Sequence, residues 1–182
     1  TRSADGVFVG RQREMGQLMD ALEAVVSGHG RLVMLVGEPG IGKTRTAREL
    51  VKYAELHGVA ALWGRCYEDQ GAPPYWPWGQ AIRSYVRERA PTQWHAEMGA
   101  GAADIAEVVS DVRELLPDLK PPPALGPEQA RFRLFDSITT FLKAAGRYQP
   151  LMVVLDDLQW ADKSSLLLLQ FIARELGQGR LL

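Results

Sequence analysis

The sequence predicts an α/β fold in which helices cover both faces of a parallel sheet. Short apolar runs alternate with longer segments whose apolar residues recur at helical spacing. The short runs are apolar throughout, as expected of strands buried on both faces. A glycine-rich loop joins the first run directly to a helix. Strands and helices that alternate in this way form a layered α/β/α domain.

A helix and a strand are expected first. Apolar side chains recur at helical spacing over residues 15–26, and a Gly-His-Gly run then breaks the helix. Residues 31–36 predict the first strand. The helix after the glycine-rich loop reaches about His57, and residues 59–63 predict the second strand.

Residues 67–126 are predicted to form a helical and proline-aromatic insertion between core strands. Within it, residues 72–78 hold three prolines and three aromatic residues, and the prolines exclude regular structure there. We interpret this run as a loop whose aromatic side chains pack on the domain; a docking surface for a partner is the alternative. Further helices are predicted over about residues 82–90, 105–115 and 127–145.

The third strand and the last helix are predicted near the end of the sequence. Residues 151–155 are an apolar run that ends in Asp156 and Asp157. A leucine-rich helix over residues 166–176 follows, and the two serines before it are its candidate cap. The final two leucines suggest the opening of another strand. We therefore expect a single domain over residues 1–182.

The run from Gly37 to Thr44 has the P-loop (Walker A) pattern G-x-x-x-x-G-K-[ST], between a predicted strand and a helix. Backbone N–H groups of such a loop, with the N-terminus of the next helix, bind phosphate oxygens. Lys43 adds a positive charge for the β and γ oxygens, and Thr44 offers a hydroxyl to Mg²⁺. The candidate nucleotide-binding residues here are Gly37, Glu38, Pro39, Gly40, Ile41, Gly42, Lys43, Thr44 and Arg45.

Asp156 and Asp157 are candidates for the second half of the site (Walker B). Ligands of parallel α/β sheets bind at the carboxyl ends of the strands, so both carboxylates are expected beside the P-loop. One carboxylate can hold the water shell of Mg²⁺ while the other orients or deprotonates a water. We assign Asp156, with Thr44, to the metal and Asp157, with Lys43, to catalysis. The sequence leaves the reverse assignment of the two aspartates open.

The composition argues against several other classes of protein. The net charge of −1 shows no basic excess, so nucleic-acid binding by this segment is not expected. No apolar run approaches the ~18 residues that span a bilayer, and no signal peptide is visible. Cys66 is the one cysteine, which fits a cytoplasmic location. We interpret Cys66 as a small buried residue, with a reactive thiol as the alternative.

Several motifs occur in an order that resembles a known family. They are Phe8-Val9-Gly10-Arg11, residues 37–45, Gly64-Arg65-Cys66-Tyr67, Pro74-Tyr75-Trp76-Pro77-Trp78 and Leu155-Asp156-Asp157-Leu158-Gln159-Trp160-Ala161-Asp162. Together they are similar to the N-terminal ATPase module of the STAND class of AAA-related P-loop ATPases. More narrowly, they resemble large ATP-binding LuxR-type bacterial regulators and related cyclase and kinase fusions. The resemblance covers nearly the whole chain and implies a P-loop NTPase fold with three α/β/α layers.

The resemblance also implies site residues and a function. Val9, Gly10 and Arg11 become candidate adenine contacts, with a solvated arginine as the alternative for Arg11. Trp160 and Asp162 are expected to shape the loop beside the γ-phosphate, with ordinary packing as the alternative for Trp160. Members of the family are switches in which bound nucleotide controls later domains, and LuxR-type members end in a DNA-reading helix-turn-helix. We therefore expect ATP and Mg²⁺ as cofactors and downstream domains as partners in signal transduction and transcription regulation.

The chain departs from the family pattern because it stops before the fourth core strand. The family's polar sensor residue, its arginine beside the γ-phosphate and its winged-helix lid would come later. An arginine finger accelerates turnover ~10³–10⁵-fold where it has been measured, so we expect nucleotide binding with little or no turnover. The fourth strand normally separates strands one and three. Those strands must then pair directly, leave a gap or recruit another molecule, and we expect a rearranged sheet or self-association.

Other classes of nucleotide-binding protein fit less well. A self-contained P-loop kinase or other NTPase acting on a small molecule is the alternative, but no basic lid or acceptor pocket is visible. A GTPase would carry a D-x-x-G switch and an N-K-x-D guanine reader, which the sequence lacks. A degenerate scaffold that binds only protein is disfavoured by the intact Lys43, Thr44, Asp156 and Asp157.

Overall fold

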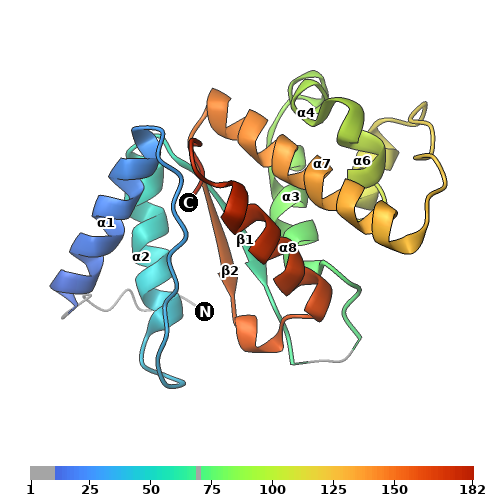
Figure 1. Ribbon diagram of the computed structural model, residues 1–182. Helices are drawn as coiled ribbons and strands as arrows, with labels where there is room; N and C mark the ends of the chain where they lie inside the picture. Colours follow the sequence, from blue (N-terminus) through green and yellow to red (C-terminus); the bar gives the residue numbers. More distant parts are fainter. Residues whose placement is uncertain (1–10, 69–70) are drawn as a thin grey trace, which may run out of the picture.

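The computed structural model describes residues 11–68 and 71–182 (Figure 1). Its sheet consists of two parallel strands, β1 (Ala60–Arg65) and β2 (Leu151–Asp156). Ala60 lies opposite Leu151, and the register continues to Arg65 opposite Asp156. These are the second and third predicted strands. The α/β class with a parallel sheet is confirmed, although the sheet of the described residues is smaller than expected.

Helices cover both faces of this sheet, as the continuous apolar strands predicted. Met152 and Val154 of β2 pack with the two helices on one face. Leu151, Val153 and Leu155 belong to the larger core on the opposite face. The first layer contains α1 (Gln12–Val26) and α2 (Lys43–Leu56), and the second contains α3 (Trp76–Glu88), α7 (Pro127–Tyr148) and α8 (Lys163–Glu175) (Figure 1).

The predicted first strand, residues 31–36, is not a strand in the structure. Its apolar side chains are exposed, by as much as 86% for Val36. A strand requires neighbouring backbone to satisfy its N–H and C=O groups. At its start the Arg31 N–H donates to the Leu181 carbonyl (3.1 Å), and residues 180–182 pair in turn with β2. The rest of the segment has no strand neighbour in the described part of the chain, so a gap separates it from β2.

The aromatic run is partly helical, so the prediction of a loop over residues 72–78 was wrong for its second half. Tyr75 takes a left-handed conformation (φ 64°) and α3 begins at Trp76. Pro77 falls in the first turn of the helix, where a missing N–H breaks no helical hydrogen bond. Trp78 is 2% exposed, and its indole N–H donates to the Ser165 carbonyl of α8 (3.1 Å). The run therefore packs α3 against α8.

The insertion between the strands folds into several short helices instead of one helix over residues 105–115. Asp104 accepts a hydrogen bond from Arg133 of α7 (2.8 Å), whereas Asp111 accepts one from Arg83 of α3 (2.7 Å). Both carboxylates are buried and bound by different helices, and the chain turns between them. The elements are α4 (Pro91–Met98), the 3-10 turn η1 (Gly99–Gly101), α5 (Ala102–Ile105) and α6 (Ser110–Leu115).

The cap of α8 also differs from the prediction. Asp162 is the N-cap residue, and its carboxylate accepts the Ser165 N–H (3.0 Å). The capping side chain is therefore that of Asp162, which precedes the helix, and Ser165 is the donor to this cap. This contact fixes the end of the turn η2 (Leu158–Trp160), which follows β2 directly.

Candidate functional site

The P-loop wraps around the start of α2. Gly40 (φ 79°) and Gly42 (φ 96°) take left-handed conformations that side chains rarely adopt, and α2 begins at Lys43. The Lys43 ammonium donates to the carbonyls of Gly37 (2.8 Å) and Glu38 (3.0 Å). The lysine charge therefore lies over the loop, beside the free N–H groups of the helix start, and this combination suits a phosphate group.

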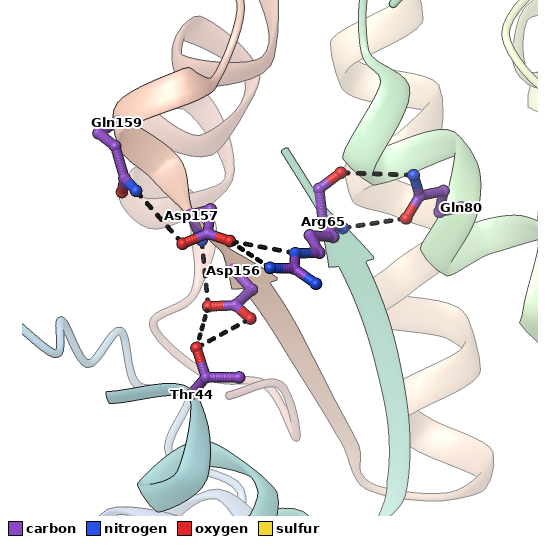
Figure 2. Close-up of polar contacts among 6 residues, drawn as sticks. All are labelled: Thr44, Arg65, Gln80, Asp156, Asp157 and Gln159. Atoms are coloured by element: carbon purple, nitrogen blue, oxygen red, sulfur yellow. Dashed lines mark hydrogen bonds and ion pairs between the residues drawn. The ribbon is translucent and has the colours of Figure 1, made fainter. Parts of the chain in front are cut away.

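Thr44 and Asp156 join the two halves of the predicted site. The Thr44 hydroxyl lies 3.0 Å from Oδ1 and 3.1 Å from Oδ2 of Asp156, although the two residues are 112 positions apart (Figure 2). The first turn of α2 thus meets the carboxyl end of β2. Hydroxyl and carboxylate oxygens are ligands that Mg²⁺ prefers, so this donor pair fits the ion.

Asp157 points away from Thr44, toward the end of β1 (Figure 2). Its Oδ2 accepts a hydrogen bond from Nε of Arg65 (3.1 Å) and forms an ion pair with Nη2 of the same guanidinium (3.0 Å). Its Oδ1 accepts a hydrogen bond from Gln159 (3.2 Å). Asp157 itself lies in the left-handed region (φ 59°), which is uncommon for a residue with a side chain. The two adjacent carboxylates therefore have different partners and different directions.

Like Gln159, Arg65 contacts Asp157 although the sequence analysis gave it no role. Its position at the end of the second strand, directly before Cys66, was the available signal. Because β1 and β2 are parallel and in register, the end of one strand lies beside the end of the other. Reading the last residue of each predicted strand as one group would have placed Arg65 with the acidic pair.

Arg11 lies against the P-loop from the start of α1. It takes a left-handed conformation (φ 62°), and its guanidinium donates to the Thr46 hydroxyl (3.3 Å) and to the Ile41 carbonyl. Val9 and Gly10, the other candidate adenine contacts, lie outside the described residues. Arg45 is exposed in the first turn of α2.

Cys66 directly follows β1, and its N–H donates to the Asp156 carbonyl at the end of β2 (3.0 Å). The side chain is 3% exposed. Burial, followed by the negative charges of Asp162, Asp157 and Asp156, raises the pKa of the Cys66 thiol to about 11. The group therefore remains a protonated thiol near neutral pH, which argues against the reactive-thiol alternative.

Trp160 and Asp162 occupy the turn after the acidic pair. Trp160 is 46% exposed. Asp162 caps α8 and accepts hydrogen bonds from both the backbone and the hydroxyl of Ser165. The role of Asp162 in the described structure is therefore to hold the turn that carries Asp157.

An apolar cleft of about 220 Å³ extends from the acidic pair along the side of β2 that faces away from β1. Residues 31–35 form one wall, and Val153 and Leu155 of β2 form part of the other. Lys43, Asp156 and Asp157 line its polar end. The cleft marks the gap left where residues 31–36 do not reach β2.

Comparison with protein-family models gives a match to the AAA ATPase domain over residues 7–182. The chain therefore belongs to the AAA ATPase domain family, whose members bind and hydrolyse nucleotide and typically use ATP with Mg²⁺. Comparisons with curated proteins and with solved structures gave no match. Among the described residues, no helix combines the length and the apolar character needed to cross a membrane.

Proposed function

We propose that this domain is the ATP-binding switch of a larger bacterial regulator of the STAND type, in which nucleotide state controls downstream domains. The observation that carries the proposal is the contact between Thr44 and Asp156. It unites a complete P-loop with an acidic strand end, which is the minimum arrangement for holding a nucleotide with its metal ion. The family match supports the nucleotide chemistry. The regulatory context, and its LuxR-type form, rest on the sequence motifs.

In this proposal the P-loop residues 37–45 bind the phosphates, with the Lys43 ammonium moving from its loop carbonyls to phosphate oxygens. Thr44 and Asp156 would hold Mg²⁺, which neutralises phosphate charge when bound. Asp157 would orient or deprotonate the attacking water. Arg11 would lie beside the adenine together with Val9 and Gly10. Its contacts with Ile41 and Thr46 support this role, because they place it over the start of α2.

Thermal unfolding with Mg-ATP, Mg-ADP and Mg-GTP tests the proposal on the wild type and on Lys43→Ala. A ligand at ~100 times its Kd adds about 2.7 kcal/mol to the free energy of unfolding, which raises Tm by about 5–11 °C in a domain of this size. We expect that rise with the adenine nucleotides and its loss in Lys43→Ala. Lys52→Ala is the matched control, because Lys52 lies on the same helix but pairs with Glu49 (3.2 Å). A wild type that no nucleotide stabilises would refute the proposal.

A further inference from the structure

We propose that residues 117–126, here called the proline segment, bind a protein that recognises proline-rich peptides in a groove lined by aromatic rings. The segment contains the run Pro121-Pro122-Pro123 directly after Lys120. The candidate nucleotide site uses none of these residues. Figure 1 shows the segment as the yellow loop between α6 and α7, on the side of the domain opposite α1 and α2. A partner bound there would leave the P-loop accessible.

The proline segment is exposed and contains no helix or strand. The rings of Pro121 and Pro123 lie at the surface, and exposure continues through residues 124–126. Leu125 is 44% exposed. In the described part of the chain, no N–H or O–H group donates to the carbonyl of Pro121 or Pro122. Apolar rings and carbonyl acceptors are therefore both available to a partner.

Covalent geometry makes the proline run stiff. Each proline ring fixes its own φ near about −65°. Lys120, Pro121 and Pro122 each precede a proline, and this disfavours the helical region for all three. The run is therefore expected in the polyproline II conformation, with about three residues per turn and no internal hydrogen bonds. Aromatic grooves bind proline-rich peptides in this form, and a segment already fixed in it loses little entropy on binding.

The fold holds the proline segment on both sides of the run. Before it, the Leu119 N–H donates to the Leu116 carbonyl (3.0 Å), and the Leu119 side chain packs against the larger core. At its end, Nη2 of Arg133 donates to the Pro123 carbonyl (3.1 Å). Nε of the same guanidinium binds the carboxylate of Asp104 (2.8 Å), a residue that is only 7% exposed. The run is therefore displayed between two anchors, which a connector of free length would not need.

Lys120 indicates the charge that the partner should offer. Its side chain is exposed, and it forms no ion pair with any residue of 11–68 or 71–182. A polyproline II helix presents similar sides along its length, so a charge at one end gives it a direction. We expect a groove with an acidic side chain opposite Lys120. Its rings would pack on the prolines, and an indole or phenol group would donate to the free carbonyls.

The alternative is that the proline segment only joins α6 to α7. Titration calorimetry of the 182-residue chain distinguishes the two roles, with an isolated WW domain whose groove carries an acidic residue as the probe. We expect the chain to bind the probe more tightly than a synthetic peptide of residues 115–128 does, because the fold presets the conformation. A chain that does not bind, or that binds more weakly than the peptide, would overturn the proposal.

Substitutions locate the binding surface. Replacing Pro121 and Pro122 together by alanine should weaken probe binding about tenfold. Lys120→Glu should weaken it about fivefold, and replacing the acidic groove residue of the probe by lysine should restore that loss. Lys120→Glu leaves the proline backbone unchanged, so it remains a test if the alanine variant unfolds.

Pro73→Ala is the matched control, because Pro73 is an exposed proline in the loop before α3. It should leave affinity for the probe unchanged. Thermal unfolding of each variant checks that lost binding does not come from lost folding. Wild-type affinity in the folded Pro121 and Pro122 variant, or an equal loss in Pro73→Ala, would show that the probe binds elsewhere and would overturn the proposal.

Discussion

Gly64→Ala tests whether β1 and α3 are held in the contact on which the site depends. The added Cβ would lie 2.0 Å from the carbonyl oxygen and 2.6 Å from the carbonyl carbon of Pro77. Both distances are far below any real Cβ contact, and the obstructing atoms are backbone, so α3 or β1 must move. Overpacking of this kind costs about 1–3 kcal/mol. We expect Tm to fall by about 2–12 °C, at about 2–4 °C per kcal/mol for a domain of this size.

The assay is thermal and urea unfolding of the wild type, Gly64→Ala and Gly71→Ala. An alanine Cβ at Gly71 meets no atom within 4 Å, so this variant controls for the loss of a glycine in the same region. Mg-ATP affinity of Gly64→Ala should also fall, because the displaced strand end carries Arg65. A Gly64→Ala protein as stable as Gly71→Ala would refute the close contact between β1 and α3.

Three further predictions concern the site and the stability of the two layers. Thr44→Val should weaken Mg-ATP binding measured by titration calorimetry, and it should have a smaller effect on nucleotide binding in EDTA, because it removes the hydroxyl that contacts Asp156. Burial would raise the pKa of Asp111, but hydrogen bonds from Arg83 and Arg87 hold that pKa below its usual range. Asp111→Asn should therefore cost about 1.5–3 kcal/mol at pH 7 in urea unfolding. Because the pKa of Asp111 is lower in the folded protein than in the unfolded chain, its ionised carboxylate stabilises the fold at pH values above the unfolded-state pKa. This stabilisation is lost as the pH falls toward the folded-state pKa. The difference in unfolding free energy between the wild type and Asp111→Asn should therefore shrink as the pH falls below about 4. Gly16→Ala, in the interior of α1 with no atom within 4 Å of the new Cβ, should raise the free energy of unfolding by about 0.5–1 kcal/mol.

Local sequence patterns were sufficient to predict the elements that depend only on nearby residues. The P-loop glycines, the helix that follows and the apolar run of β2 each depend on residues close together in sequence. The predicted partnership of Thr44 and Asp156 required one general rule, that parallel strands present their carboxyl ends at the same edge. These two residues do lie together in the structure.

The sequence failed where the structure depends on distant neighbours. Residues 31–36 are as apolar as β2, but hydrogen-bonding partners decide whether such a run becomes a strand. Pro77 was taken to indicate a loop. Proline is tolerated in the first turn of a helix, but the sequence did not reveal that α3 starts at Trp76. The pairing of Arg65 with Asp157 depends on strand register, which a list of motifs does not contain.

The smaller apolar core, in which α1 and α2 pack on β2, explains why the candidate site is assembled although most of residues 31–36 have no strand partner in the described part of the chain. In a complete parallel sheet, the strand before the P-loop would fix α2 relative to β2. Here the buried face of α2 does so, because Leu50 and Ala54 pack with Met152 of β2 and with Val59 before β1. These contacts hold the start of α2 near the end of β2, and Thr44 then reaches Asp156 across the remaining distance. A substitution such as Leu50→Ala, at a side chain that is 3% exposed, should therefore weaken Mg-ATP binding as well as lower stability by about 2–5 kcal/mol. The affinity is measured under conditions where the variant is folded. A variant that loses the expected stability but binds Mg-ATP as tightly as the wild type would show that other contacts position the P-loop.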